Sequence, residues 1–90
     1  MDLKVKILKA VANEKRVKIM NILHKNGRME LREIARIMDI PEATACRHLK
    51  ILENVNFVKS TIQNGIAEYW INNDKSLTIN QKVLAIVCDQ

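Results

Sequence analysis

The chain has 90 residues, which allows one domain, residues 1–90, with a modest hydrophobic core. Its net charge of +5 is concentrated in residues 1–61, which hold thirteen Lys and Arg against seven Asp and Glu. This distribution favours a polyanionic partner, although many ordinary domains carry a similar charge. Two cysteines exclude a disulfide framework, and no apolar run is long enough to span a membrane.

The N-terminal quarter of the sequence predicts two helices. Residues 2–11 carry apolar side chains on more than one side of a helix, and their alternation with Lys is unlike a signal peptide. We therefore expect a cytoplasmic protein with no membrane partner. Asn13 is a good N-cap for a second helix over residues 14–25, which Asn26-Gly27 ends. Its apolar side chains run nearly all round, which predicts a central, buried helix.

Residues 30–53 are predicted to form two short helices joined by a tight turn. The first helix has apolar residues at i, i+3, i+4 and i+7, namely Leu31, Ile34, Ala35 and Met38. Asp39-Ile40-Pro41 breaks the chain, because the residue before a proline disfavours helix and Pro41 suits the start of the next one. The inner face of that second helix consists of Ala45, Leu49 and Leu52.

The remainder of the sequence predicts a hairpin and a last helix. Apolar residues recur with period two in residues 57–62 and 66–71, and Asn64-Gly65 between them favours a type I′ turn. A final helix over about residues 76–88 is apolar on two faces, which suits one face for its own core and one for a second subunit. The expected fold is mainly α with a small β-hairpin over residues 57–71, a winged helix-turn-helix.

The second helix of residues 30–53 is expected to enter the major groove of double-stranded DNA. Steps of 100° from Leu49 place Ala43, Arg47 and Lys50 outward, flanked by Thr44 and Cys46. Arg can read guanine, Ala or the Thr methyl can touch thymine, and Lys more often binds phosphate. The alternative is that Arg47 and Lys50 only keep a surface helix soluble.

The hairpin and the preceding helix supply further candidates for DNA contact. The hairpin is poor in charge, since Lys59 is its only base and Glu68 opposes DNA, so its contacts are expected mainly from Gln63, Asn64 and the backbone. The candidates for phosphate contact around the first helix are Arg28, Arg32 and Arg36. Tyr69 and Trp70 alternate, so only one of them can point fully inward.

Four segments, in this order, resemble the ArsR-type (ArsR/SmtB-like) winged helix-turn-helix regulators. Residues 10–19 resemble the opening helix of that family, and Leu31–Ala35 resembles its E-L-A helix. Residues 45–52 resemble its V-S-x-H-L-x-x-L recognition helix. Val55–Lys59 with Gly65, Tyr69 and Trp70 resembles its wing. The resemblance spans roughly residues 5–72, with the segments in the same order as in the family.

The resemblance implies a homodimer that binds an imperfect inverted repeat and represses transcription until a signal releases it. It implies a dimer built from the first and last helices, and the two-faced last helix favours the same arrangement. The candidate interface residues are Leu3, Ile7, Leu8, Ile79, Val83, Leu84, Ile86 and Val87.

The sequence departs from the family at its metal sites. Many members bind metals through cysteine pairs before the recognition helix or through Asp and His on the last helix. Here Gly27–Leu31 holds neither Cys nor His, and the last helix has Cys88 and Asp89 but no His. Cys46 and His48 point to different sides of a helix. We therefore expect no metal and no cofactor.

Three alternatives remain open. Cys46 stands where the family usually has Ser. It is either a small, weakly polar replacement for that Ser or a thiol whose oxidation weakens DNA binding. A winged helix can instead serve protein–protein contact. An enzyme is not expected, because the sequence has no nucleophile triad, no informative carboxylate pair and only two glycines. His48 is interpreted as a partly buried helix residue rather than a ligand.

Overall fold

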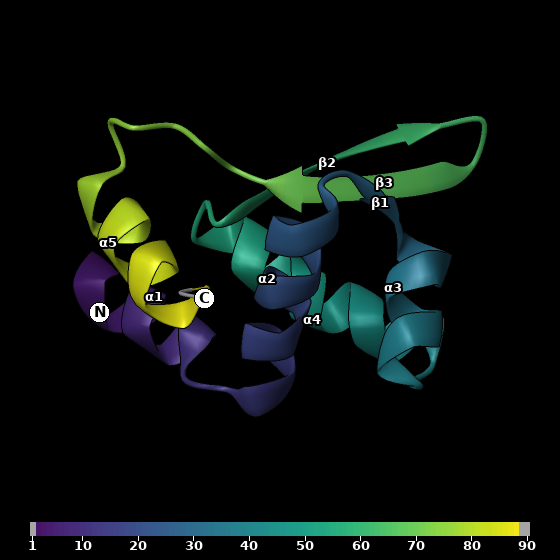
Figure 1. Ribbon diagram of the computed structural model, residues 1–90, viewed down its shortest axis with the longest axis horizontal. Helices are drawn as coiled ribbons and strands as arrows, with labels where there is room; N and C mark the ends of the chain where they lie inside the picture. The colour runs from purple at the N-terminus through teal and green to yellow at the C-terminus, as the bar shows by residue number, and fades with distance from the viewer. Residues whose placement is uncertain (1, 89–90) are drawn as a thin grey trace.

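The computed structural model describes residues 2–88, which form five helices and a three-stranded antiparallel sheet (Figure 1). The strand order is β1-β3-β2. The elements are α1 (Leu3–Val11), α2 (Glu14–Asn26), β1 (Met29–Glu30), α3 (Leu31–Met38), α4 (Glu42–Asn54), β2 (Val58–Gln63), β3 (Ile66–Ile71) and α5 (Thr78–Val87). This confirms the winged helix-turn-helix predicted from the sequence. No helix within residues 2–88 is both long enough and apolar enough to cross a membrane.

Local side-chain chemistry explains where the helices begin and end. The Asn13 side chain accepts a hydrogen bond from the Arg16 backbone N–H at 3.1 Å, which confirms Asn13 as the N-cap of α2. Gly27 ends α2 with a φ of 77°, a left-handed value that favours glycine. Asp39 ends α3 in the left-handed region, with a φ of 56°, and starts the turn toward α4.

The sheet contains the predicted hairpin and one additional strand. Asn64 and Gly65 both have positive φ, 54° and 76°, as the type I′ turn requires. The additional strand is β1, in which Met29 pairs with Tyr69 and Glu30 with Glu68. Two residues carry no detectable period, so the sequence did not predict β1. This strand fastens the start of α3 to the wing.

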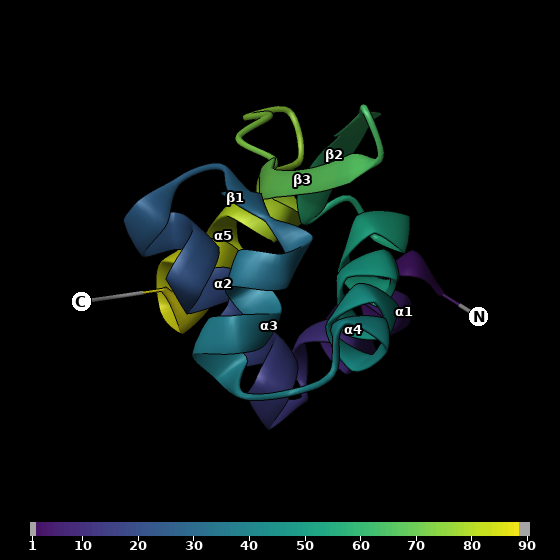
Figure 2. The ribbon, with the colours of Figure 1, turned by 90° about the vertical axis from the view of Figure 1, so that its right-hand side faces the viewer.

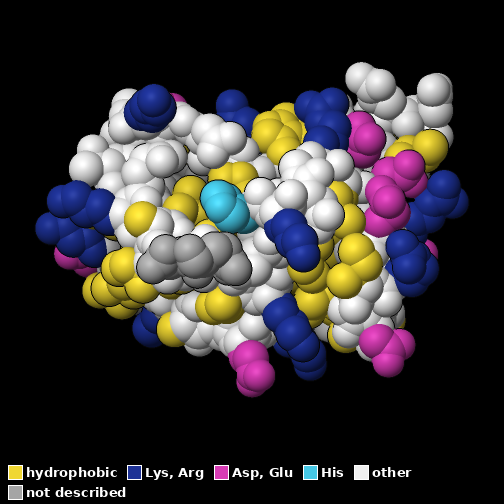
Figure 3. All heavy atoms as spheres, in the orientation of Figure 1, with side chains coloured by type: hydrophobic (Ala, Val, Ile, Leu, Met, Phe, Trp, Pro, Cys, Tyr) yellow, Lys and Arg dark blue, Asp and Glu magenta, His cyan; other side chains and the backbone are white. Residues whose placement is uncertain are grey.

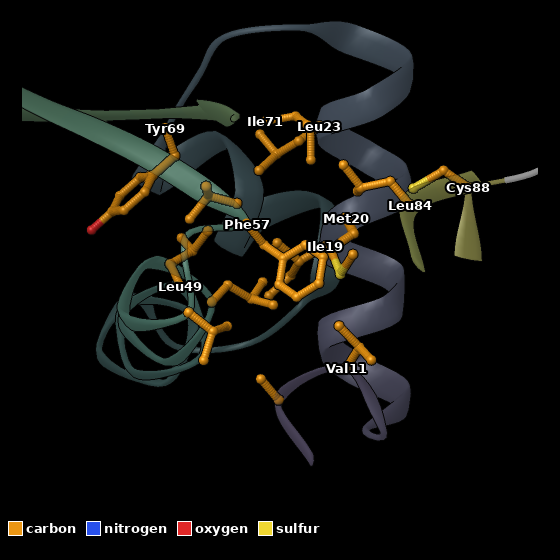
Figure 4. Packing of buried hydrophobic residues seen from close by; sticks show 14 of the residues in the cluster. Val11, Ile19, Met20, Leu23, Leu49, Phe57, Tyr69, Ile71, Leu84 and Cys88 are labelled. Atoms are coloured by element: carbon orange, nitrogen blue, oxygen red, sulfur yellow. The ribbon is translucent and has the colours of Figure 1, made fainter. Parts of the chain in front are cut away.

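The hydrophobic core lies between α2, α4 and the base of the sheet (Figure 4). The largest fully buried side chains are Phe57, Ile19, Met20, Leu23, Ile34, Leu49, Leu52 and Val58. The Phe57 ring points toward Ile19 and Met20 on α2, so this residue, shortly after α4, fills the centre of the domain. Burial of a Phe or Leu side chain stabilises a fold by roughly 1.5–3 kcal/mol each.

Two of the expected interface residues belong to this core instead. Ile7 and Leu84 are only 4% and 9% exposed and pack inside the subunit, because each sits on the inward side of its helix. Val83 and Val87 are half-buried against the same core. The candidates that stay exposed on α1 and α5 are Leu3, Leu8, Ile79 and Ile86.

The loop that joins α4 to β2 is held by two buried asparagines. The Asn80 amide on α5 donates to the backbone carbonyls of Val55 and Asn56 at 3.0 and 3.1 Å. The Asn72 amide donates to the same Asn56 carbonyl at 3.1 Å. These bonds tie α5 to the end of α4. α5 begins at Thr78 rather than at about residue 76. The residues before it form a turn, in which the Ser76 backbone N–H donates to the Asp74 carboxylate.

Candidate nucleic-acid interface

The two faces of α4 divide as the helical period predicts. Ala45, Leu49 and Leu52 are buried, whereas the side chains on the opposite face are exposed: Ala43, Arg47 and Lys50. Thr44 is half-buried beside them, and its hydroxyl accepts a hydrogen bond from Arg47 Nη2 at 3.4 Å. A bond this long and exposed leaves the guanidinium free to exchange it for a base edge.

The wing lies beside α3 and α4 on the same side of the molecule (Figure 2). Gln63 and Asn64 are exposed at the turn, and Lys59 is exposed lower on β2. Ile62 is 70% exposed and Ile66 is 44% exposed, so the tip also presents apolar side chains that were not among the expected contacts. The alternation of apolar residues predicted that these positions lie in strands, but it did not predict which face of the sheet the hydrophobic core covers.

The arginines around α3 differ in how free their charges are. Arg32 is exposed, and its Nε lies 2.9 Å from a carboxylate oxygen of Glu30. Arg36 is exposed and takes part in no ion pair within residues 2–88. Arg28 lies before β1 rather than on the helix, and its guanidinium stacks 4.0 Å above the Trp70 ring. The same guanidinium lies 3.7 Å from Glu68, so Arg28 is a poorer phosphate candidate than expected.

Cys46 does not lie on the outer face of α4. It is half-buried, and its thiol lies close enough to the phenol of Tyr69 on β3 to shift the pKa of that phenol. Burial, followed by the Cys46 thiol and the charge of Glu53, raises the pKa of Tyr69 to about 12. Cys46 is thus less exposed than Arg47 and Lys50, and the hypothesis that its oxidation weakens DNA binding stays untested.

Arg16 on α2 connects three helices through one guanidinium. Its Nε donates to the Ala10 carbonyl and its Nη2 donates to the Lys9 carbonyl at 3.4 Å, so the cation sits at the C-terminal end of α1. Its Nη1 lies 3.2 Å from Nδ1 of His48 on α4. From the sequence, Arg16 was only part of a family motif, because no local pattern signals a contact with a residue 32 positions away.

The contact with Arg16 fixes the state of His48. A guanidinium can only donate, so Nδ1 of His48 must accept and the ring proton must lie on Nε2. Burial, followed by the positive charges of Arg16, Lys15 and Arg47, lowers the pKa of His48 below its usual 6.5. The neutral imidazole is thus a structural part of the α2–α4 contact, and the interpretation of His48 as a partly buried helix residue agrees with its surroundings.

A model of the family described as "Bacterial regulatory protein, arsR family" matches residues 13–60, more than half of the chain. The chain belongs to the arsR family of bacterial regulatory proteins. The winged helix-turn-helix described above agrees with this family assignment.

Several arsR-family and related proteins are similar to this chain. The cadmium resistance transcriptional regulatory protein CadC homolog of Staphylococcus aureus is 29% identical over 69 residues, which are 77% of this chain. The chain spans only 57% of that relative. The transcriptional repressor PagR of Bacillus anthracis has a TM-score of 0.70 at 28% identity, covering 90% of this chain and 92% of PagR. A homodimeric winged helix-turn-helix DNA-binding domain from Mycobacterium bovis has a TM-score of 0.78 at 22% identity, covering 94% of this chain and 78% of that domain.

The part of this arsR-family chain that the structure describes contains no cluster of side chains suited to bind a metal ion. Across residues 2–88, no three His, Cys, Asp or Glu side chains are grouped so that they could hold a metal ion. Cys46 contacts Tyr69, and Cys88 is buried, which raises the pKa of its thiol. Asp89 lies outside the described residues. The expected lack of metal sensing stays a prediction.

Replacement of Arg16 by Met removes the hydrogen bonds that join α1, α2 and α4. We expect the free energy of unfolding to fall by about 1–3 kcal/mol, because two carbonyls and an imidazole lose a charged donor. The control Lys15→Met removes an exposed charge from the neighbouring position and should change stability by less than about 0.5 kcal/mol. Urea unfolding measures both variants, and equal losses would contradict the role given to Arg16.

The lowered pKa of His48 predicts a loss of stability in mild acid. The contribution of the neutral ring is complete above the unfolded-state pKa of 6.5 and is lost as the pH falls through the folded-state pKa. Urea unfolding at several pH values between about 7.5 and 5 should therefore give a steeper decline for the wild type than for His48→Gln. Identical declines would show that His48 does not titrate in this way.

Proposed function

We propose that the chain acts as a homodimeric transcriptional repressor that binds an inverted repeat in double-stranded DNA and does not sense metal. The observation that carries the DNA contact is the exposed outer face of α4, with Arg47 and Lys50, beside an exposed wing tip. Burial of the opposite face by Leu49 and Leu52 holds these side chains outward. The family relationship supports a regulator rather than an enzyme.

The dimer proposal rests on the apolar side chains left uncovered on the terminal helices. Leu3, Leu8 and Ile86 are 62%, 56% and 79% exposed, and α1 and α5 lie at the end of the molecule opposite α3 and the wing tip (Figure 1). Burying such side chains stabilises association. The Mycobacterium bovis neighbour is homodimeric, which supports the same assembly here. Two recognition helices in a twofold dimer suit a palindromic site.

One of the relatives supports the proposed repressor role. PagR is a transcriptional repressor, and a dimer bound across a promoter can block transcription by occupying the DNA. The metal-free proposal follows from Gly27–Leu31, which holds neither Cys nor His, although the Staphylococcus aureus relative is a cadmium resistance regulator.

Arg47→Ala tests whether α4 reads bases. If Arg47 contacts a base, the variant should lose about 1–3 kcal/mol of DNA affinity and relax the preference at one position in each half-site.

Lys50→Ala should weaken binding to all sequences and reduce the dependence of log affinity on log salt by about 0.9 for each phosphate that is no longer neutralised. Lys75→Ala, exposed in the loop after β3, is the charge-matched control and should change neither quantity. Fluorescence anisotropy with random and selected duplexes, repeated at several salt concentrations, measures both the base preference and the salt dependence of binding. Salt-independent binding of a protein partner, with no DNA binding, would favour an interaction module.

Ile86→Lys tests the dimer. This side chain is 79% exposed in the subunit, so the variant should fold but sediment as a monomer, because a charge would be buried at the interface. Ile62→Lys, similarly exposed on the wing, should remain dimeric. Analytical ultracentrifugation separates these outcomes. A dimeric, folded Ile86→Lys protein would move the interface away from α5.

A further inference from the structure

A groove of about 600 Å³ lies between α2 and α3. Its lining combines apolar Ile22, Ile37 and Met38 with the cations Lys18 and Lys25 and with three further polar residues, Asn21, His24 and Asn26. Figure 3 shows this face, where a band of hydrophobic side chains between α2 and α3 runs beside Lys and Arg side chains. The groove belongs neither to the outer face of α4 nor to the exposed faces of α1 and α5. The proposed DNA contact and dimer therefore leave it open.

The chemistry of the groove selects an amphipathic anion. Ile37 is 48% exposed there, so an occupant with a hydrocarbon chain would remove apolar surface from water. No Asp or Glu lines the groove, and within residues 2–88 neither Lys18 nor Lys25 takes part in an ion pair. The amide of Asn26 already donates to the Ile22 carbonyl at 2.8 Å. Two lysines beside apolar side chains thus complement a carboxylate with a hydrocarbon tail, and the volume falls within the roughly 300–1,000 Å³ of ligand pockets.

The groove also touches the turn between α3 and α4. Met38 is the last residue of α3, and the next residue, Asp39, ends that helix in the left-handed region. Met38 and Lys18 also line an adjoining hollow that reaches His48 on α4. An occupant that displaces Met38 would act on the end of α3, which contacts both α2 and α4. The groove is therefore placed to alter the position of the recognition helix.

We propose that the groove between α2 and α3 binds a small carboxylate with a medium-length hydrocarbon chain, and that its occupancy weakens DNA binding. The second half of this proposal rests on the proposed function, whereas the first half does not. Decanoate is the probe, and decyltrimethylammonium, with a similar chain and the opposite charge, is its matched control.

Binding is measured first in the absence of DNA, by methyl NMR of the full chain. Decanoate should shift the methyl signals of Ile22, Ile37 and Met38 in a saturable way, and decyltrimethylammonium should not. Ile37→Glu should abolish these shifts, because it puts a carboxylate into the groove at an already exposed position. Ile62→Glu, the same change at an exposed site on the wing, should leave decanoate binding unchanged. The double variant Lys18→Gln, Lys25→Gln should weaken binding by about tenfold, the effect of two partly exposed ion pairs.

The second measurement is DNA affinity with and without decanoate. The proposal is supported if decanoate weakens DNA binding by the wild type but does not change DNA binding by Ile37→Glu. Shifts confined to α1 and α5, or equal binding of the two amphiphiles, would overturn the site. Saturable groove binding with unchanged DNA affinity would overturn the regulatory half. If the protein binds no DNA at all, the proposed function fails while the NMR result still decides the site.

Discussion

The burial of one face of α4 is the constraint on which the rest of the structure depends. Leu49 and Leu52 are fully buried in the core that includes α2 and Phe57. Successive helical residues are turned by about 100°, so a rotation of α4 by one residue would replace Leu49 with Lys50 in the core. Burial of an unpaired ammonium is far less favourable than that of a leucine. The apolar core therefore fixes which side chains face outward, Arg47 and Lys50 among them.

Polar contacts then hold α4 at its middle and at its C-terminal end. Arg16 joins His48, near the middle of α4, to the end of α1, while Asn80 and Asn72 hold the loop that follows α4. Cys46 on α4 also lies near Tyr69 on β3 of the wing. The terminal helices proposed to form the dimer are thus connected to the proposed DNA-reading helix through hydrogen bonds to named groups. A change at either end of this network is therefore connected by hydrogen bonds to the surface that we propose contacts DNA.

The sequence predicted the features that repeat along the chain or act within a few residues. Helical period assigned the faces of α4, Asn13 marked the start of α2, and Asn64-Gly65 marked the hairpin. The prediction was less successful where partners are distant in sequence. Because α1 is apolar on several sides, its sequence does not indicate which side packs against the core. Ile7 was therefore wrongly assigned to the interface. The stacking of Arg28 on Trp70 depends on the register of β1, which is too short to carry a pattern.

The central claim is that two outward faces of α4, related by a twofold axis, read double-stranded DNA. Selection of bound duplexes from a random library by the full chain tests it most directly. We expect an enriched, imperfectly palindromic sequence whose half-sites are separated by about one helical turn, or roughly 10 base pairs, or a multiple of it. We also expect Arg47→Ala to relax the enriched base preference at one position in each half-site. A library that emerges with no enriched sequence, or with a single asymmetric site unaffected by Arg47→Ala, would contradict the account.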